Sequence, residues 1–414
     1  MSLAAEVHGH QDRGSLFDHY PLGPSRPSDW SAPQLFDLTR PSDEEDVHRL
    51  LRAGAVTALV DHGDEIAADL FDHKFPGERN DGAAKREFVE AAKEQGDAFG
   101  TFVYFPWLQT IVRYARKEDH LGLITSRNRN LITAEEQQTL YKGVTILNAG
   151  QSVGASVTEE LAGMGIGDTH VIADPDVIDY TNLNRIRSGV MDLGLSKVDR
   201  TAKVLSLYNP WINIVPLRDG ITPSNLLKLT NTGLIPSLIV EAVDDMPTKA
   251  RLRLFAEQHR TPLVMPGDFG DNSVIHVERY DLEETNRFGR RKPIMMGGRI
   301  SAEDTKKLAS GEMDKGDRDR AMLKHAGITN LSAAMMGSLV LMDSELGGLP
   351  QLRATTTRGA ANVAFAARQI LLARDLPSGV HKDRPRRVFG TAPDATAVGW
   401  LGAAKDLAKF AKQR

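Results

Sequence analysis

The chain has 414 residues, of which 41% are hydrophobic, and this is enough for two or three domains with sizeable cores. Its 51 basic and 55 acidic side chains give a net charge of −4, so no overall basic field draws it to nucleic acid or to a membrane surface. No apolar run approaches the ~20 residues that span a bilayer, and the N-terminus lacks the apolar core of a signal peptide. We therefore expect a cytoplasmic protein with neither nucleic acid nor membrane as a partner.

The sequence contains no cysteine. Disulfides, thiolate zinc sites and a thiol nucleophile are therefore excluded for this chain. We expect no structural zinc. A reaction that ends on a thiol would need the thiol of another molecule.

Residues 1–125 form the first predicted region, an N-terminal cap or docking region. It opens with a proline-rich, irregular stretch, which is followed by a helix-start pattern at Ser42-Asp-Glu-Glu45. Aromatic side chains cluster in residues 99–107. Because no residue pattern here suggests chemistry, we expect a small α/β or helical cap that packs on a catalytic domain. A substrate-docking module is the alternative.

Residues 126–299 form the second region, in which strand and helix patterns alternate. Helical periodicity begins near Ser156 and Ser196. Apolar or β-branched runs of strand length begin at Val144, Thr169, Ile212, Ser237, Pro262 and Val274. The alternation predicts an α/β fold with a Rossmann-like, mostly parallel sheet and helices on both faces. The basic segment at residues 283–299 has few apolar side chains and predicts a loop.

Residues 300–414 form the third region, a C-terminal helical extension. Residues 331–346 are rich in alanine, methionine and leucine, and small or apolar residues recur on one face of residues 358–372. Methionines at this spacing usually belong to a core. The same two helices are also a candidate homodimer interface.

The turn after the first strand of the second region is Ala149-Gly-Gln-Ser-Val-Gly154. It opens onto a predicted helix, whose N-terminus favours phosphate. A dinucleotide fingerprint has three glycines at such a turn, but only Gly150 and Gly154 are present here. Asp174 follows the second strand 24 residues after Gly150 (174 − 150), near the spacing of an acid that contacts a ribose hydroxyl. Together these residues predict a nucleotide site.

Further polar and charged residues fall at the predicted edge of the sheet. Asn182, Arg185 and Lys197 follow the second strand, and arginine with lysine is the usual pair for polyphosphate oxygens. A later strand ends in Glu241-Ala-Val-Asp-Asp245, whose carboxylates could hold Mg²⁺ beside the phosphates. One such charge alone usually belongs to a solvated surface. The set is more informative because it occurs at successive strand ends.

Four motifs occur in order along the second region: Asp174-Pro-Asp-Val-Ile-Asp-Tyr-Thr-Asn-Leu-Asn-Arg185, Gly194-Leu-Ser-Lys197, Asn209-Pro210 and Asp244-Asp245. They resemble the ordered motifs of the ThiF/MoeB-type adenylyltransferases, the superfamily that includes the ubiquitin-activating enzymes. The resemblance covers about residues 126–280. Upstream, Ser126-Arg-Asn-Arg-Asn-Leu-Ile132 is similar to the N-terminal arginine motif of that family.

The resemblance implies an ATP- and Mg²⁺-dependent reaction in which a carboxylate attacks the α-phosphorus, giving an acyl-adenylate and pyrophosphate. The carboxylate would be the C-terminus of a ubiquitin-like protein or peptide, or a small acid. It also implies a homodimer. Arg129 of one subunit would reach the γ-phosphate of the ATP that is bound to the other subunit, and Arg127 is the alternative.

The resemblance further assigns roles by position. Asp174 would bind the ribose, and Asp244 would bind Mg²⁺. The triphosphate would be held and polarised by Asn182, Arg185 and Lys197. The implied cofactor-binding residues are Gly150, Gly154, Asp174, Asp176 and Asn182, and the implied catalytic residues are Arg185, Lys197, Arg129 and Asp244.

Two features depart from the family pattern. Ala149, Gln151 and Ser152 stand where glycines are common, and their side chains reduce the room for close backbone approach to phosphate. The missing cysteine excludes a thioester on this chain. An acyl-adenylate would have to pass to an amine or a hydroxyl, cyclise, or go to the thiol of a partner.

Two other functions remain open from the sequence. An NAD- or FAD-dependent oxidoreductase would explain the glycine turn and Asp174, but not Arg185, Lys197 and Asp244 as a set. A non-catalytic ThiF-like binding protein would explain the altered turn. The adenylyltransferase accounts for the largest number of the motifs.

Overall fold

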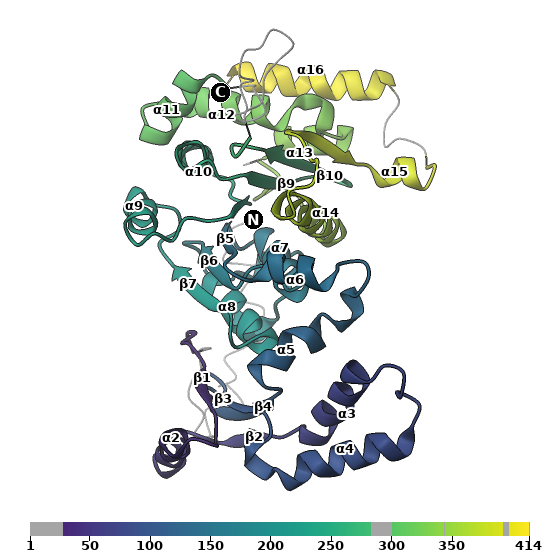
Figure 1. The fold of residues 1–414 in the computed structure, drawn as a ribbon. Coiled ribbons are helices and arrows are strands. Elements are labelled where there is room, and N and C mark those ends of the chain that lie inside the picture. The colour runs from purple at the N-terminus through teal and green to yellow at the C-terminus, as the bar shows by residue number, and fades with distance from the viewer. Residues whose placement is uncertain (1–27, 283–299, 343, 392–396, 414) are drawn as a thin grey trace, which may run out of the picture.

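The computed structural model describes residues 28–282, 300–342, 344–391 and 397–413. The loop predicted at residues 283–299 lies outside the described residues. A four-stranded sheet and a seven-stranded sheet organise the molecule. Figure 1 shows the small sheet at one end of the molecule, the large sheet in the middle, and a group of C-terminal helices at the other end.

The N-terminal unit is a small α/β unit with a core of its own. Its sheet contains Phe36, Phe102, Tyr104 and Ile111 in that core, and the predicted helix start at Ser42 is confirmed. Its elements are β1 (Gln34–Phe36), α2 (Pro41–Arg52), β2 (Ala58–Val60), α3 (Gly63–Lys74), α4 (Gly82–Glu94), β3 (Thr101–Phe105), β4 (Thr110–Tyr114) and α5 (Lys117–Ile124). The strand order is β1-β3-β4-β2.

The large sheet contains every strand predicted in the second region. Its strands are β5 (Thr145–Ala149), β6 (Thr169–Ala173), β7 (Asn213–Leu217), β8 (Leu238–Glu241), β9 (Leu263–Phe269), β10 (Asn272–Glu278) and β11 (Gly379–Asp383), in the order β11-β10-β9-β8-β5-β6-β7. Neighbours from β9 to β7 pair in parallel, whereas β10 and β11 pair antiparallel. The prediction of a mostly parallel, Rossmann-like sheet is confirmed.

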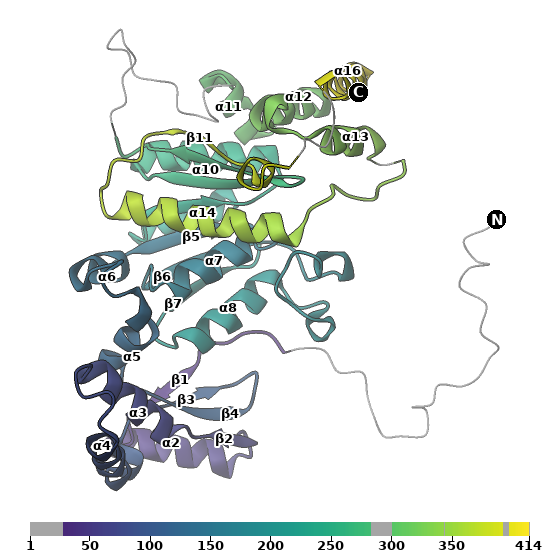
Figure 2. The ribbon, with the colours of Figure 1, turned by 90° about the vertical axis from the view of Figure 1, so that its right-hand side faces the viewer.

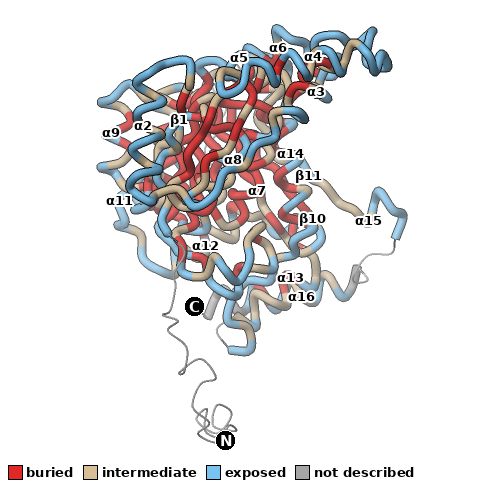
Figure 3. Tube along the Cα trace, turned by 90° about the horizontal axis from the view of Figure 1, so that it is seen from below, coloured by how far each residue is buried: buried red, intermediate tan, exposed pale blue. Residues whose placement is uncertain are grey.

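Helices cover both faces of the large sheet, also as predicted. One face carries α6 (Ala134–Tyr141), α7 (Gly154–Gly163) and α14 (Arg353–Leu371), with α8 (Lys197–Tyr208) packed beside α7. The other face carries α9 (Pro223–Asn231) and α10 (Met246–His259). Figure 2 shows α14 running beside α7, and Figure 3 shows the strands in the buried centre of the molecule.

The N-terminal unit packs against the C-terminal end of α8. The hydroxyl of Tyr114 donates a hydrogen bond to the carbonyl oxygen of Leu207 at 2.9 Å. The ring Nε2 of His120 lies 3.0 Å from the carbonyl oxygen of Tyr208. The unit, which lies at the bottom of Figure 1, therefore contacts the large domain at the last residues of α8.

The C-terminal region is mostly helical, but it also adds the edge strand β11 to the large sheet and covers one face of that sheet with α14. Its other helices are α11 (Ala302–Ser310), α12 (Lys315–Ala326), α13 (Ala333–Leu341), α15 (Pro385–Val388) and α16 (Ala397–Gln413). Met335 and Met336 of α13 are buried with Leu407 of α16, so the predicted methionine helix is core. In the described part of the chain, no helix has the length and apolar character that a membrane crossing needs.

A buried cluster of charges ties α10 to the sheet. Arg253 is fully buried and lies 3.0 Å from a carboxylate oxygen of Glu241 and 3.0 Å from one of Glu278. Lys249 Nζ lies 2.8 Å from Glu241, and the hydroxyl of Tyr280 donates to Glu278 at 2.6 Å. Burial alone would raise the pKa of Glu241, but the two cations hold it below its ordinary value. The cluster fixes the end of β8.

Replacing Arg253 by methionine should destabilise the fold strongly. The substitution leaves Glu278 without its buried cation and Glu241 with Lys249 alone, and removing one partner of a buried ion pair costs about 3–5 kcal/mol. Urea unfolding measures the change in unfolding free energy. Arg52→Met breaks an exposed ion pair with Glu45 and is the matched control, which should leave the midpoint nearly unchanged. Equally small effects in both variants would contradict the structural role of the cluster.

Candidate functional site

A cavity of about 680 Å³ opens at the carboxyl edge of the large sheet, beyond the ends of β6, β5, β8 and β9. This is the edge at which open α/β sheets bind their ligands. Seven of the residues predicted from the sequence line the cavity, namely Gly150, Asp174, Asp176, Asn182, Arg185, Lys197 and Asp244. Gly154 is the first residue of α7, directly after the turn. The fold thus brings together residues from three successive strand ends.

Gly150 and Gly154 are required by the backbone geometry of the turn. Gly150 has a φ of +86°, and a Cβ atom there would lie 2.4 Å from the carbonyl oxygen of Ala242. A Cβ atom on Gly154 would lie 2.9 Å from the Cβ of Ala242. The turn after β5 and the loop after β8 therefore touch, and a side chain at either glycine would force them apart.

Gln151 and Ser152 occupy less of the cavity than the sequence suggests. The side chain of Gln151 is buried and turned inward, where its amide nitrogen donates to the carbonyl oxygen of Asn148 at 3.2 Å. Its amide oxygen accepts a hydrogen bond from Thr158 at 3.4 Å. Ser152 lines the cavity, and its hydroxyl accepts a hydrogen bond from Arg185 Nε at 3.1 Å. Of these two side chains, only the small one of Ser152 therefore takes up space in the cavity beside the turn.

Asp174 leaves β6 with its carboxylate directed at the same turn. It accepts hydrogen bonds from the backbone N–H of Gln151 and, at 2.8 Å, from that of Asp176. Burial raises the pKa of the Asp174 carboxyl above its ordinary value, against these hydrogen bonds and the charge of Lys197. Each carboxylate oxygen has a second lone pair. Asp174 can therefore hold the turn and still accept a ribose hydroxyl.

Lys197 and Asn182 form part of the cavity wall near Asp174. Lys197 Nζ lies 2.8 Å from the carboxylate of Asp176. The lysine side chain is buried, whereas that of Asp176 is exposed. The ammonium group therefore lies at the cavity wall, and the carboxylate of its partner extends into solvent. Asn182 is buried, and its side-chain oxygen accepts the backbone N–H of Asp179 at 3.2 Å, which orients the amide group.

Arg185 is half-buried in the cavity, and no carboxylate of a described residue lies within ion-pair distance of it. Its Nε donates to Ser152, and its Nη1 donates to the carbonyl oxygen of Thr181 at 3.0 Å and to Asn184 Oδ1 at 3.1 Å. Burial lowers the pKa of Arg185, whereas the carboxylate of Asp244 acts in the opposite direction. A guanidinium held by neutral oxygens retains its charge for an anionic ligand.

Asp244 and Asp245 have different environments. Asp245 caps α10, because its carboxylate accepts the backbone N–H of Thr248 at 2.8 Å. Asp244 is exposed at the cavity and forms no hydrogen bond or ion pair with a described residue. Within the described ranges, no three His, Asp or Glu side chains are grouped so that they could hold a metal ion. A metal ion at Asp244 would therefore need phosphate oxygens as further ligands, which is a common arrangement for Mg²⁺.

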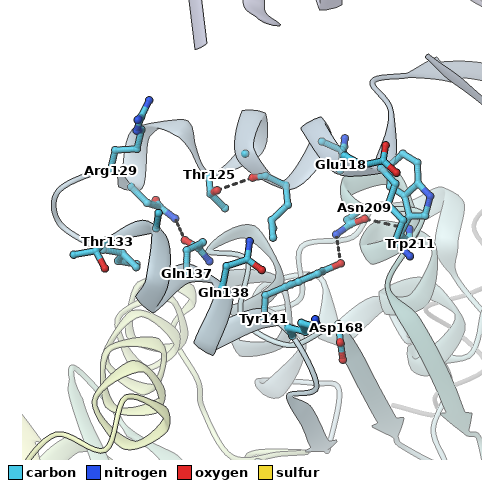
Figure 4. Close-up of a pocket in the computed structure, with 18 of the residues that line it drawn as sticks. Glu118, Thr125, Arg129, Thr133, Gln137, Gln138, Tyr141, Asp168, Asn209 and Trp211 are labelled. Atoms are coloured by element: carbon cyan, nitrogen blue, oxygen red, sulfur yellow. Dashed lines mark hydrogen bonds between the residues drawn. The ribbon is translucent and has the colours of Figure 1, made fainter. Parts of the chain in front are cut away.

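Arg129 lies at the opposite end of the sheet from this cavity. It is exposed in the segment before α6 and lines a second cavity, of about 1090 Å³, together with Tyr141, Asp168 and Trp211 (Figure 4). Asp168 precedes β6 and Asp174 follows it, so the two cavities are separated by the length of that strand, roughly 17 Å. Arg129 therefore does not join the other predicted residues within one chain.

Asp268, near the end of β9, is a cavity residue that sequence patterns do not identify. Its side chain is 8% exposed, and neither carboxylate oxygen has a hydrogen-bond partner among the described residues. Burial raises the pKa of Asp268 to about 7, against the charge of Arg358. The sequence offers one signal for it, an acid at the end of a predicted strand. Many surface residues share that position.

Residues 125–288 match the model of the ThiF family. Over 280 residues, the chain is 32% identical to the uncharacterized protein MT1398 of Mycobacterium tuberculosis, an alignment that covers 67% of this chain and 37% of that protein. Over 135 residues, it is 32% identical to the tRNA threonylcarbamoyladenosine dehydratase of Escherichia coli, covering 32% of this chain and 49% of the relative. The chain thus spans about a third to a half of these relatives.

A solved structure of the Escherichia coli tRNA N6-threonylcarbamoyladenosine dehydratase, TcdA, in complex with ATP is also similar. The structural alignment has 18% sequence identity and a TM-score of 0.41, and it covers 61% of this chain and 95% of that one.

The fold and the cavity define the chain as a Rossmann-like α/β protein with a cavity at the carboxyl edge of its sheet, where open α/β folds bind their ligands. Residues 125–288 contain the glycine turn, Asp174, Arg185, Lys197 and Asp244. Residues 125–288 are therefore a ThiF-family domain, which confirms the resemblance found in the sequence motifs.

The ionisation of Asp268 should make the protein less stable as the pH rises from about 4 to 7. The pKa of Asp268 is higher in the folded protein than in the unfolded chain. The contribution of Asp268 to the free energy of unfolding is therefore fully present below the pKa of the unfolded chain, and it is lost as the pH rises through about 7. Asp268→Asn removes this dependence. Between about pH 5 and pH 7, the variant should gain roughly 3 kcal/mol of unfolding free energy relative to the wild type.

Urea unfolding at several pH values measures this difference. Asp271→Asn, an exposed substitution at the turn that follows β9, is the control and should show the wild-type pH dependence. Parallel pH curves for Asp268→Asn and the wild type would show that Asp268 ionises normally in the fold.

Proposed function

We propose that the chain is an adenylating enzyme that uses ATP and Mg²⁺ to activate a carboxylate. The observation that carries this proposal is the guanidinium of Arg185. It lies half-buried in the cavity on neutral oxygens of Ser152, Thr181 and Asn184, without a carboxylate partner in the described part of the chain. A triphosphate supplies the negative charge that such a cation lacks.

In the proposed complex, the nucleotide lies across the carboxyl edge of the sheet. Asp174 binds the ribose, and the triphosphate follows the turn at the N-terminus of α7, where the helix dipole favours negative charge. Lys197 and Asn182 contact it from the cavity wall. The incoming carboxylate oxygen attacks the α-phosphorus, the bond from the α-phosphorus to the bridging oxygen breaks, and pyrophosphate leaves.

The adenylation step needs charge stabilisation more than a general base, because the attacking carboxylate is already ionised at neutral pH. Arg185 and Lys197 stabilise the charge that develops on the phosphate oxygens in a preorganised site. Mg²⁺, when bound at Asp244, would supply further positive charge on those oxygens. Asp244 suits this ion because it is an oxygen ligand without another partner among the described residues.

The proposed substrate is the C-terminal carboxylate of a ubiquitin-like protein or peptide, or a small acid. The Escherichia coli relative is named for a tRNA substrate, but the net charge of −4 here argues against nucleic acid as a partner. Because the chain has no cysteine, the acyl-adenylate passes to its acceptor without a thioester on this chain. A cytoplasmic location, where ATP is available, completes the proposal.

The proposal includes a homodimer that supplies Arg129 in trans. Arg129 and the nucleotide cavity lie at opposite ends of β6, so an arginine that contacts the γ-phosphate would come from a second copy. Leu131, two residues after Arg129, is 77% exposed, and Phe365 of α14 is 53% exposed. Arg368 joins them, since its Nη1 lies 3.5 Å from the carbonyl oxygen of Leu131 and its guanidinium lies over the Phe365 ring. An exposed apolar patch of this kind suits contact with another protein surface.

Arg185→Met should reduce carboxylate-dependent exchange of labelled pyrophosphate into ATP by about 100-fold or more, as expected when one preorganised charge is removed. The acids to test are peptides that end in Gly-Gly, amino acids and small mono- and dicarboxylic acids. Arg187→Met is the matched control. Its guanidinium lies outside the cavity and pairs with Glu160 at 2.7 Å, so the variant should keep its exchange activity.

The wild type itself provides the test of the whole proposal. Absence of exchange with every acid, together with no ATP binding in calorimetry, would rule out an adenylating enzyme. ATP binding without exchange would instead support the non-catalytic alternative.

Mixing two inactive variants tests whether Arg129 acts in trans. Arg129→Ala and Arg185→Ala should each be inactive, but a mixed dimer has one site with both arginines. Random mixing in equal amounts should therefore restore about a quarter of the wild-type exchange rate. Arg127→Ala replaces Arg129→Ala in a parallel experiment. No recovery in either mixture would contradict an arginine supplied by the partner subunit.

A further inference from the structure

Asp268 is a buried carboxylate for which the adenylation step has no use. Neither of its oxygens has a hydrogen-bond partner among the residues that the structure describes. Leaving a buried acceptor without a donor costs free energy, and such groups in native proteins usually have a catalytic role or a missing partner molecule. Because Asp268 also lines the cavity, the missing donor is expected from a molecule bound there.

The position of Asp268 along the sheet edge indicates which part of the reaction it faces. The cavity runs from Asp174 after β6, past β5, to Asp244 after β8 and then to Asp268 on β9. β9 is adjacent to β8, so Asp268 lies about one strand spacing, roughly 5 Å, beyond the strand of Asp244. With the ribose at Asp174, the acyl group on the α-phosphate extends toward β9.

The groups packed around Asp268 do not neutralise it. Arg358 faces it from α14, but the Nε of Arg358 lies 3.6 Å from the carboxylate of Asp383 on β11. Ser273 lies opposite Asp268 on β10 in the strand register. Gly359 of α14 packs directly against the carboxylate of Asp268, because a Cβ atom on this glycine would lie only 3.3 Å from Asp268 Oδ1. Asp268 is thus enclosed by protein on one side and borders the cavity on the other.

We propose that Asp268 is the catalytic base that removes a proton from an alkylammonium group bound in the cavity, so that the free amine can attack the acyl-adenylate. The proposal rests on the adenylation proposed above and adds the class of acceptor. The amine nitrogen bonds to the carbonyl carbon, the bond from that carbon to the AMP oxygen breaks, and its electron pair leaves with AMP. Asp268 takes the first proton from the ammonium nitrogen before the attack and later releases it to solvent. The second proton leaves the nitrogen to solvent after the bond to the carbonyl carbon has formed, so the products are an amide, AMP and two protons.

An amine fits the chemistry of the chain better than a thiol or water does. An alkylamine is protonated at neutral pH and cannot attack until a base removes a proton. Burial holds the pKa of Asp268 near neutrality, where a base is effective. Ammonium and amine N–H groups also supply the hydrogen-bond donors that the carboxylate lacks. The absence of cysteine leaves direct transfer as a route for the acyl group.

The test compares Asp268→Asn with the wild type in two amine-transfer reactions. Both use ATP, Mg²⁺ and the acid that gives the fastest pyrophosphate exchange, and amide formation is followed by mass spectrometry. Aminoethanol, which is protonated at neutral pH, needs the base. Hydroxylamine, which is largely unprotonated there, does not. The variant should lose about 100-fold or more of its transfer to aminoethanol, while exchange and transfer to hydroxylamine change little.

Asp271→Asn is the matched control and should behave as the wild type in all three reactions. Transfer to aminoethanol at the wild-type rate by Asp268→Asn would overturn the base, and so would exchange by the wild type without any amide. Equal losses of exchange and of both transfers would show that Asp268 has only a structural role. Absence of exchange in the wild type contradicts the adenylation proposal itself, and the two failures are thereby distinguished.

Discussion

The site depends on one close contact between two loops at the carboxyl edge of the sheet. The backbone N–H of Ala242 donates to the carbonyl oxygen of Ala149 at 2.8 Å, and Gly150 and Gly154 have no side chain to separate the two segments. Because β8 is next to β5, this contact brings Asp244 beside the glycine turn and the start of α7. A carboxylate for a metal ion and a helix end for phosphate can then face one ligand.

Two carboxylates at this edge, Glu241 at the end of β8 and Asp244 in the loop after it, are only three residues apart but have different surroundings. Glu241 is fully buried and compensated by Lys249 and Arg253, so it contributes to the rigidity of the strand end. Asp244 and Arg185 face the cavity without such partners in the described residues. The end of β8 thus carries a compensated carboxylate that stabilises the fold, followed by an open carboxylate that is available for the proposed ligand.

Residues at the ends of parallel strands could be placed from the sequence, because such ends meet at one sheet edge, as Asp174 and Asp244 do. The direction of a side chain within a turn could not. Gln151 turns inward because its amide bonds to Asn148 and Thr158, which no spacing rule reveals. Asp268 escapes prediction because its burial depends on α14, about 90 residues later (359 − 268). The separation of Arg129 from the cavity follows only once the length of β6 is known.

The late position of α14 and β11 in the chain has a consequence for synthesis. Residues 150–245 supply the cavity lining from the ends of β5, β6 and β8, whereas the end near β9 is backed by α14, which follows much later in the chain. The ribosome completes the first part well before the second, by roughly ten seconds at about 5–20 residues per second. A nascent chain therefore has the residues proposed to bind ATP before α14 encloses the end of the cavity near Asp268. Only completion of the C-terminal region gives the cavity the walls that the proposed reaction needs.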